Sequence, residues 1–112
     1  LVVDSTNNRV GIGTASPSAA LDVTGDLSIA DKIIHTGDTN TAIRFPAADT
    51  VSFETSGSER FRVASSGQLG VGGANYGTSG QLLTSGGNGA APTWSDAPSS
   101  GASTGFVYFL RG

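Results

Sequence analysis

The chain has 112 residues and contains no cysteine and no methionine, with one histidine and one lysine. Without cysteine, a disulfide-stapled domain and a Cys-based zinc site are both excluded. Charged residues make up only 13% of the chain, the formal net charge is −3, and no basic cluster occurs, which disfavours nucleic-acid binding. The longest apolar run, Phe106 to Leu110, is far shorter than the roughly 20 residues of a membrane helix. We therefore expect no membrane insertion.

Small, turn-prone residues dominate instead: 17 Gly, 15 Ser and 12 Thr. Gly, Ser and Thr are poor helix formers, so a helical bundle is disfavoured. Apolar and polar residues alternate over short stretches bounded by Gly, Asn, Asp and Ser, which is the pattern of half-buried strands separated by turns. These stretches are 21–23, 27–29, 43–45, 51–54, 61–63 and 69–71. The sequence predicts an all-β fold of short strands and Gly-rich turns.

Only 25 residues are Leu, Ile, Val or Phe, too few and too scattered for a large private core. The low net charge and the many β-branched residues nevertheless argue against a disordered chain. We therefore predict that the core is shared between copies, most simply in an elongated, intertwined fibrous homotrimer of β-prism or β-helix type. The expected core and inter-subunit residues are Val10, Ile12, Leu21, Val23, Leu27, Ile29, Phe45, Phe53, Phe61, Phe106 and Phe109.

Composition changes near residue 63, because residues 1–63 hold 13 of the 15 charged residues. We expect an alternating-strand fibre module over 1–63. We expect a Gly/Ser-rich, low-charge shaft or connector over 64–112, ending in an apolar strand at 105–110. The chain begins with Leu rather than Met, which favours a fragment or a processed product.

Patterns that carry chemistry are weak. Gly11-Ile12-Gly13 resembles the start of a nucleotide-binding loop, but no helix pattern follows to hold a phosphate. The stretch 86–89 matches half of a Gly-rich calcium repeat whose Asp position is Ala91. We predict no catalytic residue, no cofactor and no metal; three copies of His35 around a three-fold axis are a remote metal site.

The two carboxylates Glu54 and Glu59 flank a predicted turn and are expected to face each other, with Arg60 and Arg62 as cross-strand partners. Most Phe residues occupy inward positions of alternating runs. Trp94 and Tyr76 lie in Gly-rich surroundings, so they are the candidate surfaces for stacking a glycan.

Two short segments echo each other: 9–13 (R-V-G-I-G) and 68–72 (Q-L-G-V-G). The copies are too few and irregular for a solenoid, but they suggest that small β units are reused.

The segment from Asn8 to Asp26 resembles the V-G-I-G-T-x-x-P-x-x-x-L-D-V-x-G segment of phage tail fibres and related bacterial surface fibres. Residues 37–63, including I-R-F-P at 43–46 and E-R-F-R-V at 59–63, resemble a module of marine-phage tail fibres. Residues 76–94, from Y-G-T-S-G-Q-L-L to A-P-T-W, are similar to another such module. The resemblance implies a trimeric β fibre on an extracellular virion, in contact with other virion or fibre proteins and serving host attachment, without enzyme activity. It identifies neither a self-cleaving chaperone domain nor a receptor-binding tip in this chain.

Three other functions remain open. The chain could be a carbohydrate-binding module that uses Trp94 and Tyr76 on a host surface glycan. It could be a subunit of a bacterial extracellular filament or adhesin, joined head to tail through Phe106–Leu110. It could also be a fibre that decorates the capsid.

Overall fold

A computed structural model describes residues 1–99. The described residues form ten strands and no helix, so the predicted all-β class is confirmed. The chain forms two compact units, Leu1–Ala30 and Asp31–Gly112. The predicted apolar strand at 105–110, with Phe106 and Phe109, lies outside the described residues.

The N-terminal unit, Leu1–Ala30, is a three-stranded sheet in the order β1 (Val2–Asp4), β2 (Arg9–Ile12) and β3 (Leu21–Val23). β1 and β2 are antiparallel and are joined by a turn in which Asp4 accepts hydrogen bonds from the backbone amides of Thr6 and Asn7. β2 and β3 are parallel. A parallel pair requires the connecting chain to cross one face of the sheet, and residues 13–20 do so.

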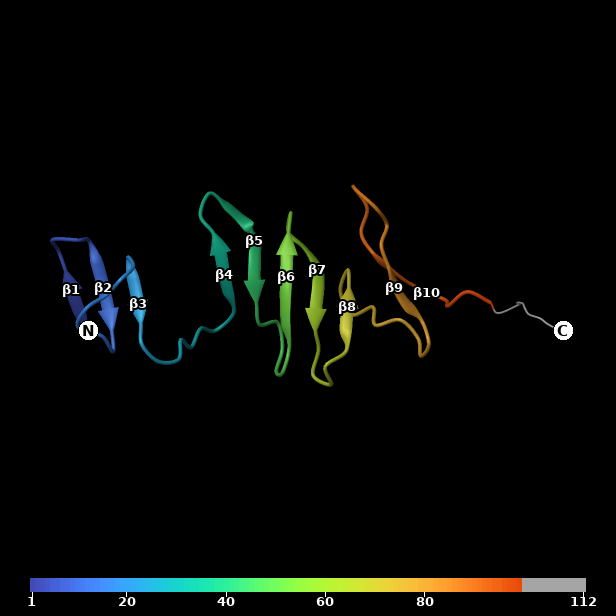
Figure 1. The fold of residues 1–112 in the computed structure, drawn as a ribbon, viewed down its shortest axis with the longest axis horizontal. Helices are drawn as coiled ribbons and strands as arrows, with labels where there is room; N and C mark the ends of the chain where they lie inside the picture. Colours follow the sequence, from blue (N-terminus) through green and yellow to red (C-terminus); the bar gives the residue numbers. More distant parts are fainter. Residues whose placement is uncertain (100–112) are drawn as a thin grey trace. The chain divides into compact units, whose positions relative to one another are not determined.

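The second unit contains a five-stranded antiparallel sheet in sequence order, which Figure 1 shows as a simple meander. Its strands are β4 (Lys32–His35), β5 (Asp38–Arg44), β6 (Val51–Thr55), β7 (Ser58–Val63) and β8 (Leu69–Val71). A two-stranded antiparallel hairpin follows, formed by β9 (Leu82–Thr84) and β10 (Thr93–Ser95). The connections between β4 and β5 and between β6 and β7 are two-residue turns containing Gly37 and Gly57 at positive φ, the glycine conformation that tight hairpins favour.

Most alternating stretches correspond to strands, but one does not. Residues 21–23, 51–54, 61–63 and 69–71 lie in strands, and 43–45 overlaps the end of β5. The prediction of a strand at Leu27–Ile29 is wrong: these residues follow β3 in irregular backbone. Alternation makes a segment compatible with a strand, but a strand also needs a neighbour that completes its hydrogen bonds. No described segment pairs with this stretch.

The composition boundary near residue 63 falls inside the five-stranded sheet. β7 and β8 pair across it, with Val63 opposite Leu69 and Phe61 opposite Val71. The compact units separate between Ala30 and Asp31 instead. Strand pairing continues across this drop in the number of charged residues, because charge on the solvent side of a strand does not decide which strands form hydrogen bonds.

Candidate functional site

An apolar row crosses all five strands of the second unit. Ile33 lies opposite Ile43, Ile43 opposite Phe53, Phe53 opposite Phe61, and Phe61 opposite Val71. Residues directly opposite each other in a sheet project from the same face, so these five side chains form one continuous line. Near its middle the rings of Phe53 and Phe61 lie with their centroids 6.3 Å apart. The register therefore builds one connected surface from five separate segments.

Four more apolar residues extend this surface, because each lies two positions along the chain from a member of the row: Phe45, which directly follows β5, and Val51, Val63 and Leu69 within strands. Val51, Val63 and Leu69 are themselves opposite one another across β6, β7 and β8. We call the nine residues the five-strand apolar face. Much of it is open in the single chain: Ile33 is 51% exposed, Phe45 44% and Phe53 40%. Most monomeric proteins would bury such a face, so it is the principal candidate site of this unit.

The opposite face of the same sheet is charged and internally paired. Arg44 donates to both oxygens of Asp31 and to Glu54, each at 3.0 Å. The hydrogen bond to Glu54, followed by those to Asp31, raises the pKa of Arg44 above its ordinary value. Arg62 forms a two-pronged pair with Glu59 at 2.6 and 2.7 Å. Neither arginine is left as a free cation to attract an anionic ligand.

Glu54 and Glu59 lie opposite each other in the register of β6 and β7, as predicted. Of the two expected partners, Arg62 binds Glu59, but within the same strand and not across strands, and Glu54 is bound by Arg44 of β5. Arg60 donates instead to the Thr55 hydroxyl. The two carboxylates are thus each held by an arginine, and the Arg44–Glu54 pair connects neighbouring strands.

Ser52 is fully buried on this charged face, between Arg44 and Arg62 on the neighbouring strands. Its hydroxyl has no hydrogen-bond partner among the described residues. The flanking arginine stems account for this burial because long charged side chains cover the surface beneath them while their heads reach their partners.

The chain itself covers the charged face at β8. Gly70 is buried there, and a Cβ at this position would overlap the carbonyl oxygen of Gly73 and crowd the Tyr76 ring at 3.1 Å. Gly72 takes a positive φ of 69°, which turns the chain back over the strand. The five-strand apolar face is on the other side of the sheet; at β8 its member Val71 is buried, whereas Leu69 is 37% exposed.

The N-terminal unit repeats this arrangement. Val3, Val10 and Leu21 form an apolar row across its three strands, and Ile12 lies opposite Val23 on the same face. We call these five residues the three-strand apolar face. Val3 is 69% exposed, Leu21 55% and Ile12 45%. Four expected assembly residues, Val10, Ile12, Leu21 and Val23, are thus brought together.

The crossover from β2 to β3 covers the other face at Gly11, which is buried. A Cβ at Gly11 would overlap the carbonyl oxygen of Thr14 and lie 3.4 Å from Pro17. Gly13 takes a positive φ of 76°. Arg9 also holds this crossover loop, because its guanidinium donates to the carbonyl oxygen of Pro17.

The echo between residues 9–13 and 68–72 therefore has a structural meaning. In both copies the first glycine is buried beneath the carbonyl three residues later, and the second glycine makes the turn. The apolar residues on either side of the first glycine project from the uncovered face. The motif ends a strand and covers the glycine-bearing face of the sheet with the chain's own backbone, and its apolar residues project from the other face, where Val71 is buried and Ile12 and Leu69 are exposed.

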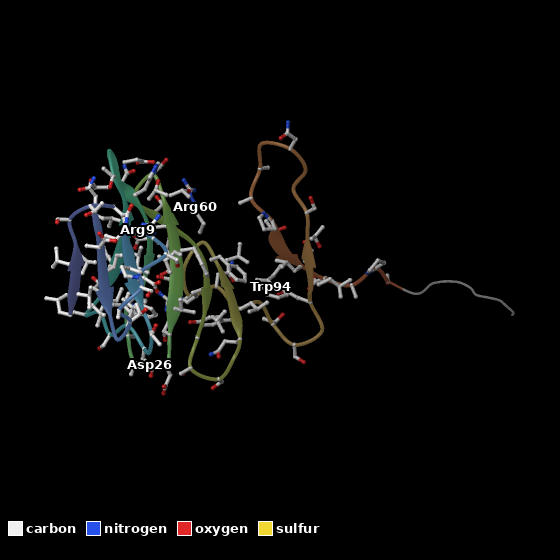
Figure 2. The ribbon with its side chains drawn as sticks, turned by 60° about the vertical axis from the view of Figure 1, so that its left-hand side comes forward. Arg9, Asp26, Arg60 and Trp94 are labelled. Carbon is white, nitrogen blue, oxygen red and sulfur yellow. The ribbon has the colours of Figure 1, made fainter. Side chains whose placement is uncertain are left out.

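Trp94 and Tyr76, the candidate glycan-stacking residues, are both half-buried and contact the chain itself. The Trp94 indole donates to the carbonyl oxygen of Asn75 at 3.1 Å, and its ring lies against Gly77, where a Cβ would be 2.8 Å from Cγ. Figure 2 shows Trp94 where the hairpin meets the preceding loop. Gln81 strengthens this junction by donating to Asp96.

A hollow of about 360 Å³ lies where the β4–β5 and β6–β7 hairpins have register shifts, and it is lined largely by Ile33, Ile34, Ile43 and Phe53. His35 lies at the edge of this hollow and is exposed, with its Nδ1 atom 3.7 Å from Oδ2 of Asp38.

Within residues 1–99, no three His, Asp or Glu side chains gather as metal ligands would. The same residues contain no helix long and apolar enough to cross a membrane.

Sequence reasoning found part of the candidate site. Of the five-strand apolar face it named Phe45, Phe53 and Phe61 and missed six aliphatic members: Ile33, Ile43, Val51, Val63, Leu69 and Val71. The signal was present in the alternation of each stretch. Leu27 and Ile29, which were also expected in the core, lie outside both faces in irregular backbone.

No protein-family model matches the sequence, and comparisons with curated proteins and with solved structures find no match either.

Proposed function

We propose that this chain is a segment of a structural virion fibre that assembles as an elongated homotrimer and serves attachment to a host surface. One observation carries the proposal: each unit covers the glycine-bearing face of its sheet with its own chain and exposes a continuous apolar face. A surface of this kind is stable in water when it meets another apolar surface. Copies of the same chain supply such a surface without any further partner.

A standard interface buries roughly 800 Å² on each partner, and the exposed side chains of the two apolar faces are the surface available for such burial. In a three-fold assembly, each sheet would turn its apolar face toward the axis, and the five-stranded sheet would turn its arginine–carboxylate pairs toward solvent.

The resemblance of residues 8–26, 37–63 and 76–94 to phage tail-fibre modules supports the location on an extracellular virion and the contact with other fibre proteins. The abundance of small residues supports the same proposal, since Gly and Ser at the tight turns allow backbones of neighbouring copies to approach closely. We assign no enzymatic step to the chain; the paired carboxylates Glu54 and Glu59 are each held by an arginine.

The test is the native mass of the 112-residue chain by light scattering coupled to size exclusion. We expect a mass three times 11.2 kDa. A single-chain mass over a wide concentration range would overturn the assembly on which the proposal stands. An open-ended ladder of masses would instead support the head-to-tail filament, and its loss on deletion of residues 106–110 would identify the joining segment.

A further inference from the structure

The hairpin of β9 and β10 carries a chemically labile dipeptide at its tip. The connecting loop includes Gly87, Asn88 and Gly89, with Asn88 and Gly89 in a turn. All three residues are exposed, and both glycines have positive φ. A Cβ built on either glycine would have no atom within 4 Å, so no side chain packs on this part of the loop, although the Gly87 amide donates to the Ser85 hydroxyl. The backbone amide of Gly89 forms no hydrogen bond to a backbone carbonyl of the described residues.

We infer that Asn88 is a site of spontaneous deamidation. The backbone nitrogen of Gly89 attacks Cγ of the Asn88 side chain; a C–N bond forms, the amide proton is lost to solvent and the side-chain nitrogen leaves as ammonia. Water then opens the cyclic succinimide at either carbonyl and gives Asp or isoaspartate. The net change is asparagine plus water to an acid plus ammonia, with no oxidant, reductant or enzyme.

Local structure favours this step at Asn88. The following residue is glycine, which has no Cβ to shield its nitrogen and which reaches backbone angles that other residues rarely adopt. The attack also requires the backbone to reorganise, which an unpacked turn permits more readily than a paired strand.

The other four asparagines form an internal control: Asn7, Asn8, Asn40 and Asn75. Each precedes a residue larger than glycine. Asn7 donates to Asp4, and Asn75 accepts from Gly77, so their side chains are also held in place. Asn40 lies within β5, where strand pairing restrains its backbone.

The modification would alter an uncharged part of the molecule. No charged residue occurs from Ala64 to Ser95, so a carboxylate at the hairpin tip would be the first charge there. The formal net charge of one chain would change from −3 to −4, because a neutral amide becomes an acid. An isoaspartate would also add a methylene to the backbone path of the loop. In a homotrimer all three hairpin tips would change with age.

The experiment is incubation of the full chain at neutral and mildly alkaline pH, followed by ion-exchange chromatography and peptide mapping. We expect an acidic species to accumulate, faster at the higher pH because the attacking amide must lose its proton. Peptide mapping should place the amide-to-acid mass change at Asn88 ahead of the other four asparagines, with isoaspartate among the products.

The matched variant is Asn88→Gln, which keeps an amide at an exposed position but must close a larger ring. We expect it to fold as the parent does and to lose the early acidic species. If N88Q forms acidic species as fast as the parent, or if another asparagine converts first, the assignment is wrong. A parent chain that stays unmodified at alkaline pH would also refute it.

Discussion

Phe53 of β6 and Phe61 of β7 lie directly opposite each other, with ring centroids 6.3 Å apart and ring planes tilted by 36°. The pair lies within the five-strand apolar face, where Ile43 and Val71 continue the row on either side. Aromatic pairs at this separation attract each other beyond the area that they bury. Phe53 nevertheless remains 40% exposed in the single chain, which leaves part of its surface for another contact.

Replacing Phe53 by Thr should weaken the proposed trimer. Thr is β-branched and suits a strand but lacks the ring, and the burial lost on assembly is a fraction of the about 1.5–3 kcal/mol for a whole side chain, because Phe53 is 40% exposed beforehand. Light scattering should show dissociation at a higher protein concentration than for the parent. The control is Asn40→Thr, which introduces the same residue at an exposed position on the charged face. Equal dissociation of both variants would count against assembly through the apolar face.

Alanine at Gly11 or Gly70 should destabilise the unit that contains it. At each position the added Cβ meets a backbone carbonyl oxygen, which cannot rotate away as a side chain can. Overpacking of this kind costs about 1–3 kcal/mol, and chemical unfolding measures it. Ser28→Ala, at an exposed position outside the strands, is the control and should stay within about 0.5 kcal/mol of the parent. Wild-type stability in both glycine variants would show that the loops cover the sheets differently.

Ser52→Ala should leave stability unchanged or raise it by up to about 1 kcal/mol. The buried hydroxyl has no partner in the described residues, and removing an unsatisfied polar group recovers its desolvation cost. Thermal unfolding followed by circular dichroism is a sufficient measurement. A clear loss of stability would show that the hydroxyl forms a hydrogen bond in solution, for example to a water molecule.

Glu59→Gln should destabilise the five-stranded sheet more than His35→Ala does. Glu59 and Arg62 are 17% and 21% exposed and form two charge-assisted hydrogen bonds, which raise the pKa of Arg62. His35 and Asp38 are 67% and 49% exposed and 3.7 Å apart, so solvent screens that pair. Urea unfolding of both variants at low and high salt gives the comparison. The same small effect in both would indicate that the Glu59 pair is also well solvated.

Asp4 should make stability depend on pH in the acidic range. Hydrogen bonds from Asn7, and then from Thr6, lower the pKa of Asp4 below its ordinary value of 3.8. A lowered folded-state pKa means that the stabilisation is present above the unfolded-state value and is lost as the pH falls through the folded-state value. Asp4→Asn should therefore be less stable than the parent near neutral pH, and the difference should shrink in acid. A difference that is independent of pH would place the effect in the turn geometry instead.

Trp94 and Tyr76 lie in Gly-rich sequence, which made them the candidate surfaces for stacking a glycan. Both are half-buried in the structure. The glycines instead let other groups approach closely: Gly77 lies against the Trp94 ring, and Gly70 lies beneath Tyr76. The sequence alone does not distinguish a glycine that makes the backbone flexible from a glycine that lets another group pack closely against the backbone.

The all-β class, the positions of most central strands and the apolar side of each followed from local sequence, because alternation and turn residues act over a few neighbours. Glu54 and Glu59 were also placed opposite each other from the turn between them. The irregular backbone at Leu27–Ile29 did not follow, since strand formation depends on a partner elsewhere in the chain.

Only the tertiary structure decided how these local pieces combine. Register aligned Ile33, Ile43, Phe53, Phe61 and Val71 into one row, and it selected Arg44 rather than a hairpin neighbour as the partner of Glu54. The tertiary structure also showed which face of each sheet the loops cover, at Gly11 and at Gly70. Contacts of this kind join residues that are distant in sequence, so their geometry depends on strand pairing and not on local propensity. The sequence by itself determined that apolar stripes exist, and the pairing of the strands decided that they form continuous exposed faces.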